Sequence, residues 1–198
     1  MSSRNKERDN PTETLPEVEG YRPVKKTISI LIANVWAMLL MAVSGLAGWE
    51  AINLLWPSAG YAPLDIIWFI LLIVVALVVH ELVHGVTWLL LLKKGFRHLR
   101  FGVMTGAVYC HIDVPMVKRQ YVVGALMPLL LVGVLPWLAG IATGSVLWMA
   151  LGAIMIGGAA GDLMIVWTIR KEPSDTLVYD HPSEAGCYVY RTLQDTQS

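Results

Sequence analysis

The sequence predicts an all-α polytopic membrane protein, with four transmembrane helices and a short β-hairpin-like cytoplasmic loop between the second and third. Three observations support this fold class. The 198-residue chain is 56% hydrophobic and 15% charged, with a mean hydropathy of +0.57, which is too apolar for an ordinary soluble domain. Four apolar runs approach or exceed the roughly 20 residues that cross a bilayer. The basic residues avoid two of the loops between these runs.

The apolar runs divide the chain into three parts. Residues 1–26 are polar and contain three prolines, which predicts a flexible cytoplasmic arm. Residues 27–171 hold the spans and form the expected four-helix transmembrane domain. Residues 172–198 are polar again and form a cytoplasmic tail. The four spans are expected near residues 28–49, 65–92, 121–141 and 146–169.

The basic residues predict the orientation of these spans. All 15 Lys and Arg precede the first span, lie between the second and third, or follow the fourth. By the positive-inside rule, both termini and the 93–120 loop are cytoplasmic, in a multi-pass protein that we expect in a prokaryotic cell membrane. Topology accounts for the loop charges, so we expect a lipid bilayer and no nucleic acid as partner. Cys110 and Cys187 both fall on the reducing side, which implies no disulfide.

The second span contains the pattern HExxH, as His80-Glu81-Leu82-Val83-His84. Two histidines four residues apart lie on one face of a helix, where their ring nitrogens can share one Zn²⁺. The glutamate between them can take a proton from a metal-bound water. Three ionisable side chains in a lipid-embedded helix cost about 3 kcal/mol each on insertion scales, which a metal would offset. The alternative is a polar cluster that joins helices by hydrogen bonds.

The fourth span supplies a candidate third ligand, Asp162, which follows a run of small residues. His84 and Asp162 lie roughly 12 Å and 10 Å from the cytoplasmic ends of their helices, at 1.5 Å per residue. Both helices run from outside to inside, so the carboxylate and the imidazoles are predicted at similar depth. The carboxylate and the two imidazoles would form the three protein ligands of a catalytic zinc site, with one position left for water. The alternative for Asp162 is a hydrogen bond to another helix.

Other candidate metal ligands remain on the cytoplasmic side. His111 and Asp113 are second choices, because their loop lies under the site, whereas Asp180 and His181 reach a metal only if the tail folds back. Branched and aromatic residues with spaced glycines predict one or two short strands over residues 99–113. A strand edge beside a metal is a platform for an extended peptide, although a hairpin without a substrate fits equally well.

The third span contains Pro128 and Pro136, which predict kinks or a broken helix. The order of HExxH, strand-like loop, proline-bearing span and Gly161-Asp162 resembles the site-2 protease class of intramembrane zinc metalloproteases. More closely, the chain resembles the DUF3267 family of zincin peptidases. The segments that carry the resemblance lie within residues 65–190, at residues 80–85, 109–115, 124–128, 161–162 and 180–186.

The resemblance implies that His80, His84 and Asp162 bind zinc and that Glu81 is the catalytic base. The aspartate context departs from the site-2 protease pattern, since Leu163 stands where a glycine usually follows. The expected function is zinc-dependent hydrolysis of transmembrane or membrane-associated protein substrates. The alternatives are a metal carrier, a metal-stabilised assembly factor and a metal-free scaffold. Glu81 discriminates between them, because only hydrolysis requires a base.

Overall fold

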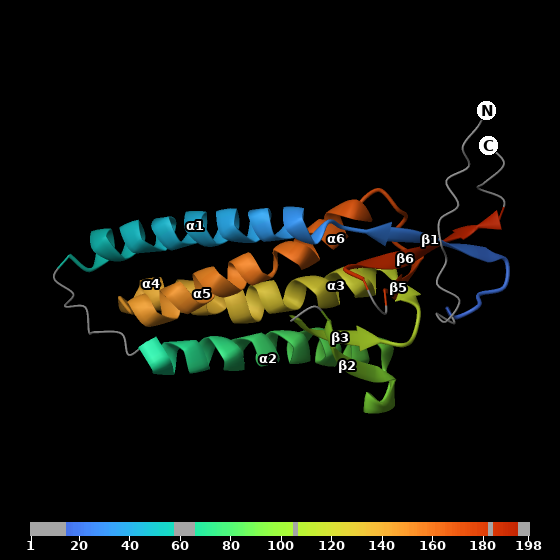
Figure 1. Ribbon diagram of the computed structural model, residues 1–198, viewed down its shortest axis with the longest axis horizontal. Helices are drawn as coiled ribbons and strands as arrows, with labels where there is room; N and C mark the ends of the chain where they lie inside the picture. The colour runs from blue at the N-terminus through green and yellow to red at the C-terminus, as the bar shows by residue number, and fades with distance from the viewer. Residues whose placement is uncertain (1–14, 58–65, 105–106, 182–183, 194–198) are drawn as a thin grey trace.

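The computed structural model describes residues 15–57, 66–104, 107–181 and 184–193. Long helices lie side by side, and the strands gather at one end of them (Figure 1). Four continuous helical segments are long and apolar enough to cross a membrane. The first is α1 (Ile30–Leu55) and the second is α2 (Ile66–Leu92). Apolar residues lie on every side of both helices, as expected of helices that face lipid, and α2 also carries the HExxH motif.

The third apolar segment contains three consecutive helical pieces. Helix α3 (Lys118–Pro128) passes into the π-helix η2 (Leu129–Val134), which passes into α4 (Leu135–Thr143). Pro128 has no N–H to donate to the preceding turn, and the π-helical turns that follow it keep the helix continuous. The expected break at the prolines is therefore a local change of helical pitch.

The fourth apolar segment consists of α5 (Val146–Gly158) and α6 (Ala160–Thr168), with a change of direction at Ala159. Glycines bring this segment close to its neighbours. A Cβ atom on Gly152 would lie 2.3 Å from the backbone nitrogen of Trp137 in α4, and one on Gly157 would lie 2.7 Å from the carbonyl oxygen of Ala37 in α1. Small residues thus permit close helix packing here, a feature that is common in membrane bundles.

The described residues also contain six strands, so the expectation of an all-α chain is wrong. Strands β2 (Leu99–Met104) and β3 (Ala107–Ile112) form the expected hairpin, which follows the 3₁₀ turn η1 (Phe96–His98). A second, four-stranded antiparallel sheet has the order β1-β6-β5-β4. Its strands are β1 (Tyr21–Thr27), β4 (Met116–Val117), β5 (Leu177–Asp180) and β6 (Gly186–Thr192).

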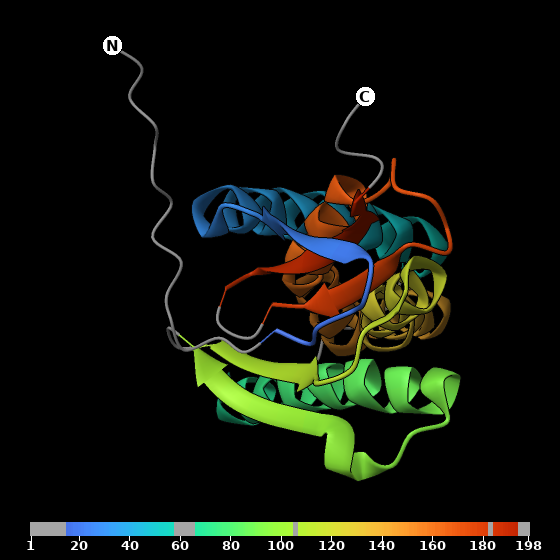
Figure 2. The same ribbon diagram turned by 90° about the vertical axis from the view of Figure 1, so that its right-hand side faces the viewer.

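The four-stranded sheet joins the two ends of the chain. Residues 21–26, expected in a flexible arm, belong to β1, which pairs along its whole length with β6 in the expected tail. The Tyr190 hydroxyl donates to the Pro16 carbonyl over 2.8 Å, and Lys25 forms an ion pair with Glu184. Viewed from this end, β1 and β6 lie side by side in front of the helices (Figure 2). Residues 1–14 lie outside the described part of the chain.

The largest buried cluster lies where helices and sheet meet. It combines Trp88 and Leu89 of α2, and Ile169 at the end of α6, with residues of α3 and both sheets: Ile112, Met116, Tyr121, Ala125, Val178, Cys187 and Val189. Side chains that follow the last helix therefore share one core with the second half of α2. The HExxH motif lies directly beside this core, which fixes its surroundings.

Candidate metal centre

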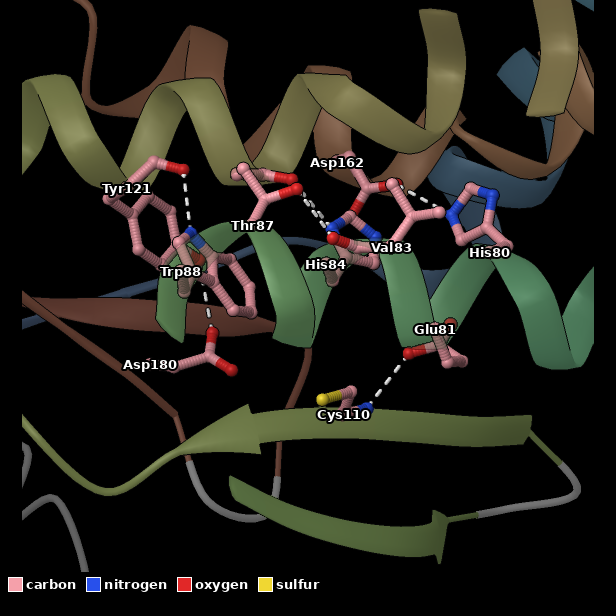
Figure 3. Close-up of polar contacts among 11 residues, drawn as sticks. His80, Glu81, Val83, His84, Thr87, Trp88, Cys110, Tyr121, Asp162 and Asp180 are labelled. Carbon is pink, nitrogen blue, oxygen red and sulfur yellow. Dashed lines mark hydrogen bonds and ion pairs between the residues drawn. The ribbon is translucent and has the colours of Figure 1, made fainter. Parts of the chain in front are cut away.

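Helix α2 presents His80 and His84 one turn apart, and both rings point at Asp162 on α6 (Figure 3). The Nε2 atom of His80 lies 3.3 Å from Oδ2 of Asp162, and the Nε2 atom of His84 lies 3.4 Å from Oδ1. One potential ligand atom from each side chain lies within 4.8 Å of the others. The expected proximity of Asp162 to the histidine pair is therefore observed.

The donor set fits a zinc ion. Zinc in proteins is held tetrahedrally by nitrogen and oxygen ligands at about 2.0–2.1 Å, which places neighbouring ligand atoms roughly 3.3–3.4 Å apart. The two nitrogen–oxygen distances have this value. The histidines are 6% and 5% exposed, and the Asp162 side chain is 22% exposed. Buried imidazoles require polar partners, and a metal ion shared with the carboxylate would be one. Two imidazoles and one carboxylate leave a fourth position for water or substrate.

A backbone contact orients one of the two rings. The Nδ1 atom of His84 lies 3.0 Å from the carbonyl oxygen of Gly124 in α3. Nδ1–H donates to that carbonyl, so the neutral ring carries its lone pair on Nε2, the atom that faces Asp162. The tautomer that this contact selects is the one that a metal requires.

Glu81 lies on the side of α2 that faces strand β3 (Figure 3). Its Oε2 atom accepts a hydrogen bond of 2.8 Å from the backbone N–H of Cys110. This bond holds the carboxylate through Oε2 and does not involve Oε1. Gly85 permits the approach, because a Cβ atom there would lie 2.7 Å from the Cys110 sulfur. The residue that follows the HExxH motif thus has to be small for the hairpin to reach the site.

A cavity of about 220 Å³ adjoins these side chains. Its lining includes Glu81, His84 and Asp162 together with Asp180 at the end of β5 and Gly186 at the start of β6. The cavity therefore connects the donor set to the sheet end of the molecule. The remaining lining residues are Trp88, Cys110, Tyr121, Ala125, Ile165, His181, Glu184 and Ala185.

The second-choice ligands have other contacts. Asp113 pairs with His98 over 2.9 Å and with Arg100 over 3.1 Å. The Nδ1 atom of His111 lies 3.4 Å from Asp180. Among the described residues, neither side chain belongs to the group that could hold a metal. They do not converge on the donor set.

The tail does fold back, and this is the part of the site that sequence reasoning missed. Asp180 and His181 line the cavity beside the histidine pair. Asp180 accepts a hydrogen bond of 3.0 Å from the Tyr121 hydroxyl, and the Nδ1 atom of His181 accepts from the backbone N–H of Glu184 over 2.9 Å. The alternating branched and aromatic residues of 186–192 were the available signal for a strand that returns the tail to the helices.

Fold and site together define a helical protein whose buried His₂Asp set, with an adjacent glutamate, has the composition of a metallopeptidase centre. The family model of DUF3267, described as "Putative zincin peptidase", matches residues 73–177, which is more than half of the chain. The chain belongs to this family. No curated protein and no solved structure matches it.

Proposed function

We propose that this protein is a zinc-dependent peptidase of the membrane, which cleaves transmembrane or membrane-associated proteins next to the cytoplasmic end of its helices. The observation that carries the proposal is the convergence of His80, His84 and Asp162 beside Glu81, at a cavity whose wall includes Glu81, His84 and Asp162. Membership in a family of zincin peptidases supports hydrolysis as the reaction. The four apolar helices support a membrane location.

The residues divide the work of hydrolysis. His80, His84 and Asp162 would hold the zinc ion, which when bound acidifies a water and polarises the scissile carbonyl. Glu81 accepts the proton that the water loses as its oxygen bonds to the carbonyl carbon. The same carboxyl then gives this proton to the leaving nitrogen as the C–N bond breaks. Atoms and charge balance with water as the only co-reactant.

Strand β3 supports an extended substrate. It pairs with β2 on one side and faces α2 on the other (Figure 3). The N–H of Cys110 points at Glu81 and so away from β2. A strand edge of this kind can bind a peptide by main-chain hydrogen bonds, which would keep the scissile bond extended beside the donor set. The cavity gives water a path to the site from the sheet end.

The decisive experiment compares two substitutions in the purified protein. Glu81→Gln should retain about one zinc per chain and lose roughly 10²–10⁴-fold of the cleavage of dye-labelled casein or a membrane-anchored reporter, the range for loss of a general base. His80→Ala should lose both zinc and cleavage. Zinc is measured by elemental analysis and cleavage by fluorescence.

Glu50→Gln is the matched control, because Glu50 is an exposed carboxylate on α1 and its loss should change neither quantity. Full cleavage by Glu81→Gln would overturn the assigned mechanism. A metal carrier gives a different pattern, in which zinc transport into vesicles survives Glu81→Gln and is lost in His80→Ala. A metal-free scaffold gives a wild type without stoichiometric zinc.

A further inference from the structure

Three aromatic rings form a continuous stack that begins at the donor set. The rings of His84 and Trp88 lie 5.4 Å apart at an angle of 18°, and the rings of Trp88 and Tyr121 lie 5.6 Å apart at 19°. Both spacings fall in the range of favourable ring contacts. The face of the His84 imidazole is therefore held against a ring that is itself held on its other side.

Trp88 is fixed by its edge as well as by its faces. Its Nε1–H donates to the carbonyl oxygen of Tyr121 over 3.1 Å, and its indole lies against the backbone of α3 at Gly124. A Cβ atom on Gly124 would lie 2.0 Å from Nε1 of Trp88. The indole therefore has one place to lie, between the ring of His84 and the first turns of α3 (Figure 3).

The far end of the stack is tied to the C-terminal sheet. Tyr121 is 2% exposed, and its hydroxyl donates to Oδ1 of Asp180 over 3.0 Å. Asp180 is the last residue of β5, and its Oδ2 atom lies 3.4 Å from Nδ1 of His111 on β3. The Asp180 carboxylate thus joins the stack to both sheets. It lies outside residues 73–177, the part of the chain that matches the family model.

We propose that strand β5 positions the metal ligand His84 through the sequence of contacts Asp180–Tyr121–Trp88–His84. Asp180, Tyr121 and Trp88 are then positioning residues, and the hairpin of β5 and β6 contributes to the geometry of the metal centre. The inference rests on the proposed function, because it presupposes that His84 binds zinc. The physical reason is that groups which fix the orientation of a ligand ring raise metal affinity by holding the lone pair on its target.

The test measures zinc affinity of the full-length protein in detergent by competition with a chromophoric chelator. Trp88→Leu removes the ring that contacts His84 and should raise the zinc dissociation constant about 10–100-fold, the range for loss of an outer-shell partner. Trp88→Phe keeps a ring there and should recover most of the affinity. The visible absorption of the cobalt-substituted protein should shift in Trp88→Leu, because the ligand geometry changes.

A double-mutant cycle separates positioning from general damage. Tyr121→Phe and Asp180→Ala break the same hydrogen bond, so each should weaken zinc binding, and the double variant should be no weaker than the more affected single variant. Asp180→Asn keeps an oxygen acceptor for the Tyr121 hydroxyl and should bind zinc like the wild type. Trp137→Phe is the control, because Trp137 donates to the Ser44 carbonyl over 2.9 Å in the distant part of the bundle.

The outcomes are distinct. Zinc affinities of Trp88→Leu, Tyr121→Phe and Asp180→Ala within twofold of the wild type would overturn the positioning sequence and leave the proposed peptidase intact. Additive losses in the cycle would also overturn it, since independent damage adds. A wild type that binds no zinc would overturn the proposed function and this inference with it.

Discussion

Gly124 lies where α3 packs against α2, and the absence of its side chain serves the site in two ways. Its carbonyl oxygen accepts from His84 Nδ1, and its open Cα leaves room for the Trp88 indole. Glycine is required here by contact and not by backbone conformation. Single residues thus determine the metal centre through main-chain atoms that the HExxH motif does not include.

We expect Gly124→Ala to destabilise the protein by about 1–3 kcal/mol, the usual cost of overpacking, and to weaken zinc binding, since the indole and the carbonyl must shift. Thermal unfolding in detergent measures the first effect and chelator competition the second. Gly45→Ala is the matched control, because a Cβ atom there meets nothing within 4 Å. Equal melting temperatures for the two variants would contradict the packing argument.

At the scale of elements, two strands each place a cysteine in the core. Cys110 lies on β3 at the site, and Cys187 lies on β6. Burial raises the pKa of the Cys110 thiol to about 12, with a further contribution from the charge of Glu81. Burial likewise raises the pKa of Cys187 to about 12, helped by Asp180. Both thiols are therefore neutral packing groups at physiological pH.

Neither cysteine should react with iodoacetamide at pH 8 in the native protein, and both should react in denaturant, as mass spectrometry would show. The folded pKa lies above the ordinary thiol value of 9.0. The stability that the neutral thiols contribute is therefore complete below pH 9 and is lost as the pH rises towards 12. Rapid native alkylation at pH 8, at the rate of an exposed Ser174→Cys variant, would show that these strands are not packed as described.

Considered as a whole, the molecule gathers both ends of its chain at one end of the helical bundle. Strand β1 precedes the first apolar helix, strands β5 and β6 follow the last, and all three belong to one sheet. If each of the four apolar helices crosses a bilayer, the strands before the first and after the last lie on the same side of it. The sheet requires the same arrangement, because β1 and β6 pair directly.

Labelling of intact cells with a membrane-impermeant maleimide tests this topology. Ala142 lies near the end of α4 and Ser174 lies between α6 and β5, and both are exposed. Ala142→Cys should label in intact cells, whereas Ser174→Cys should label only after permeabilisation, because the positive-inside rule places its side in the cytoplasm. The buried native cysteines give little background. The reverse labelling pattern would invert the proposed orientation.

Sequence reasoning succeeded where a pattern within one helix, or a comparison of depths, is sufficient. The HExxH spacing places two imidazoles on one helix face, and the distances of His84 and Asp162 from their helix ends predicted that they meet. Sequence reasoning failed where a contact depends on how segments far apart in the sequence pack against one another. Pro23 and three basic residues made β1 look unlike a strand, yet pairing with β6 overrides that composition. Asp180 gave no local sign that it would lie beside His111.

The sequence alone determined the four apolar helices, the hairpin between the second and third, and the residues that form the donor set, because each depends on local periodicity or on helix length. Only the tertiary structure decided that β1 and β6 pair in one sheet, that residues at the adjoining ends of β5 and β6 line the cavity, and that Asp180 and Tyr121 contact His84 through Trp88. Local residues encode which elements form, but burial of a shared core selects which distant elements meet.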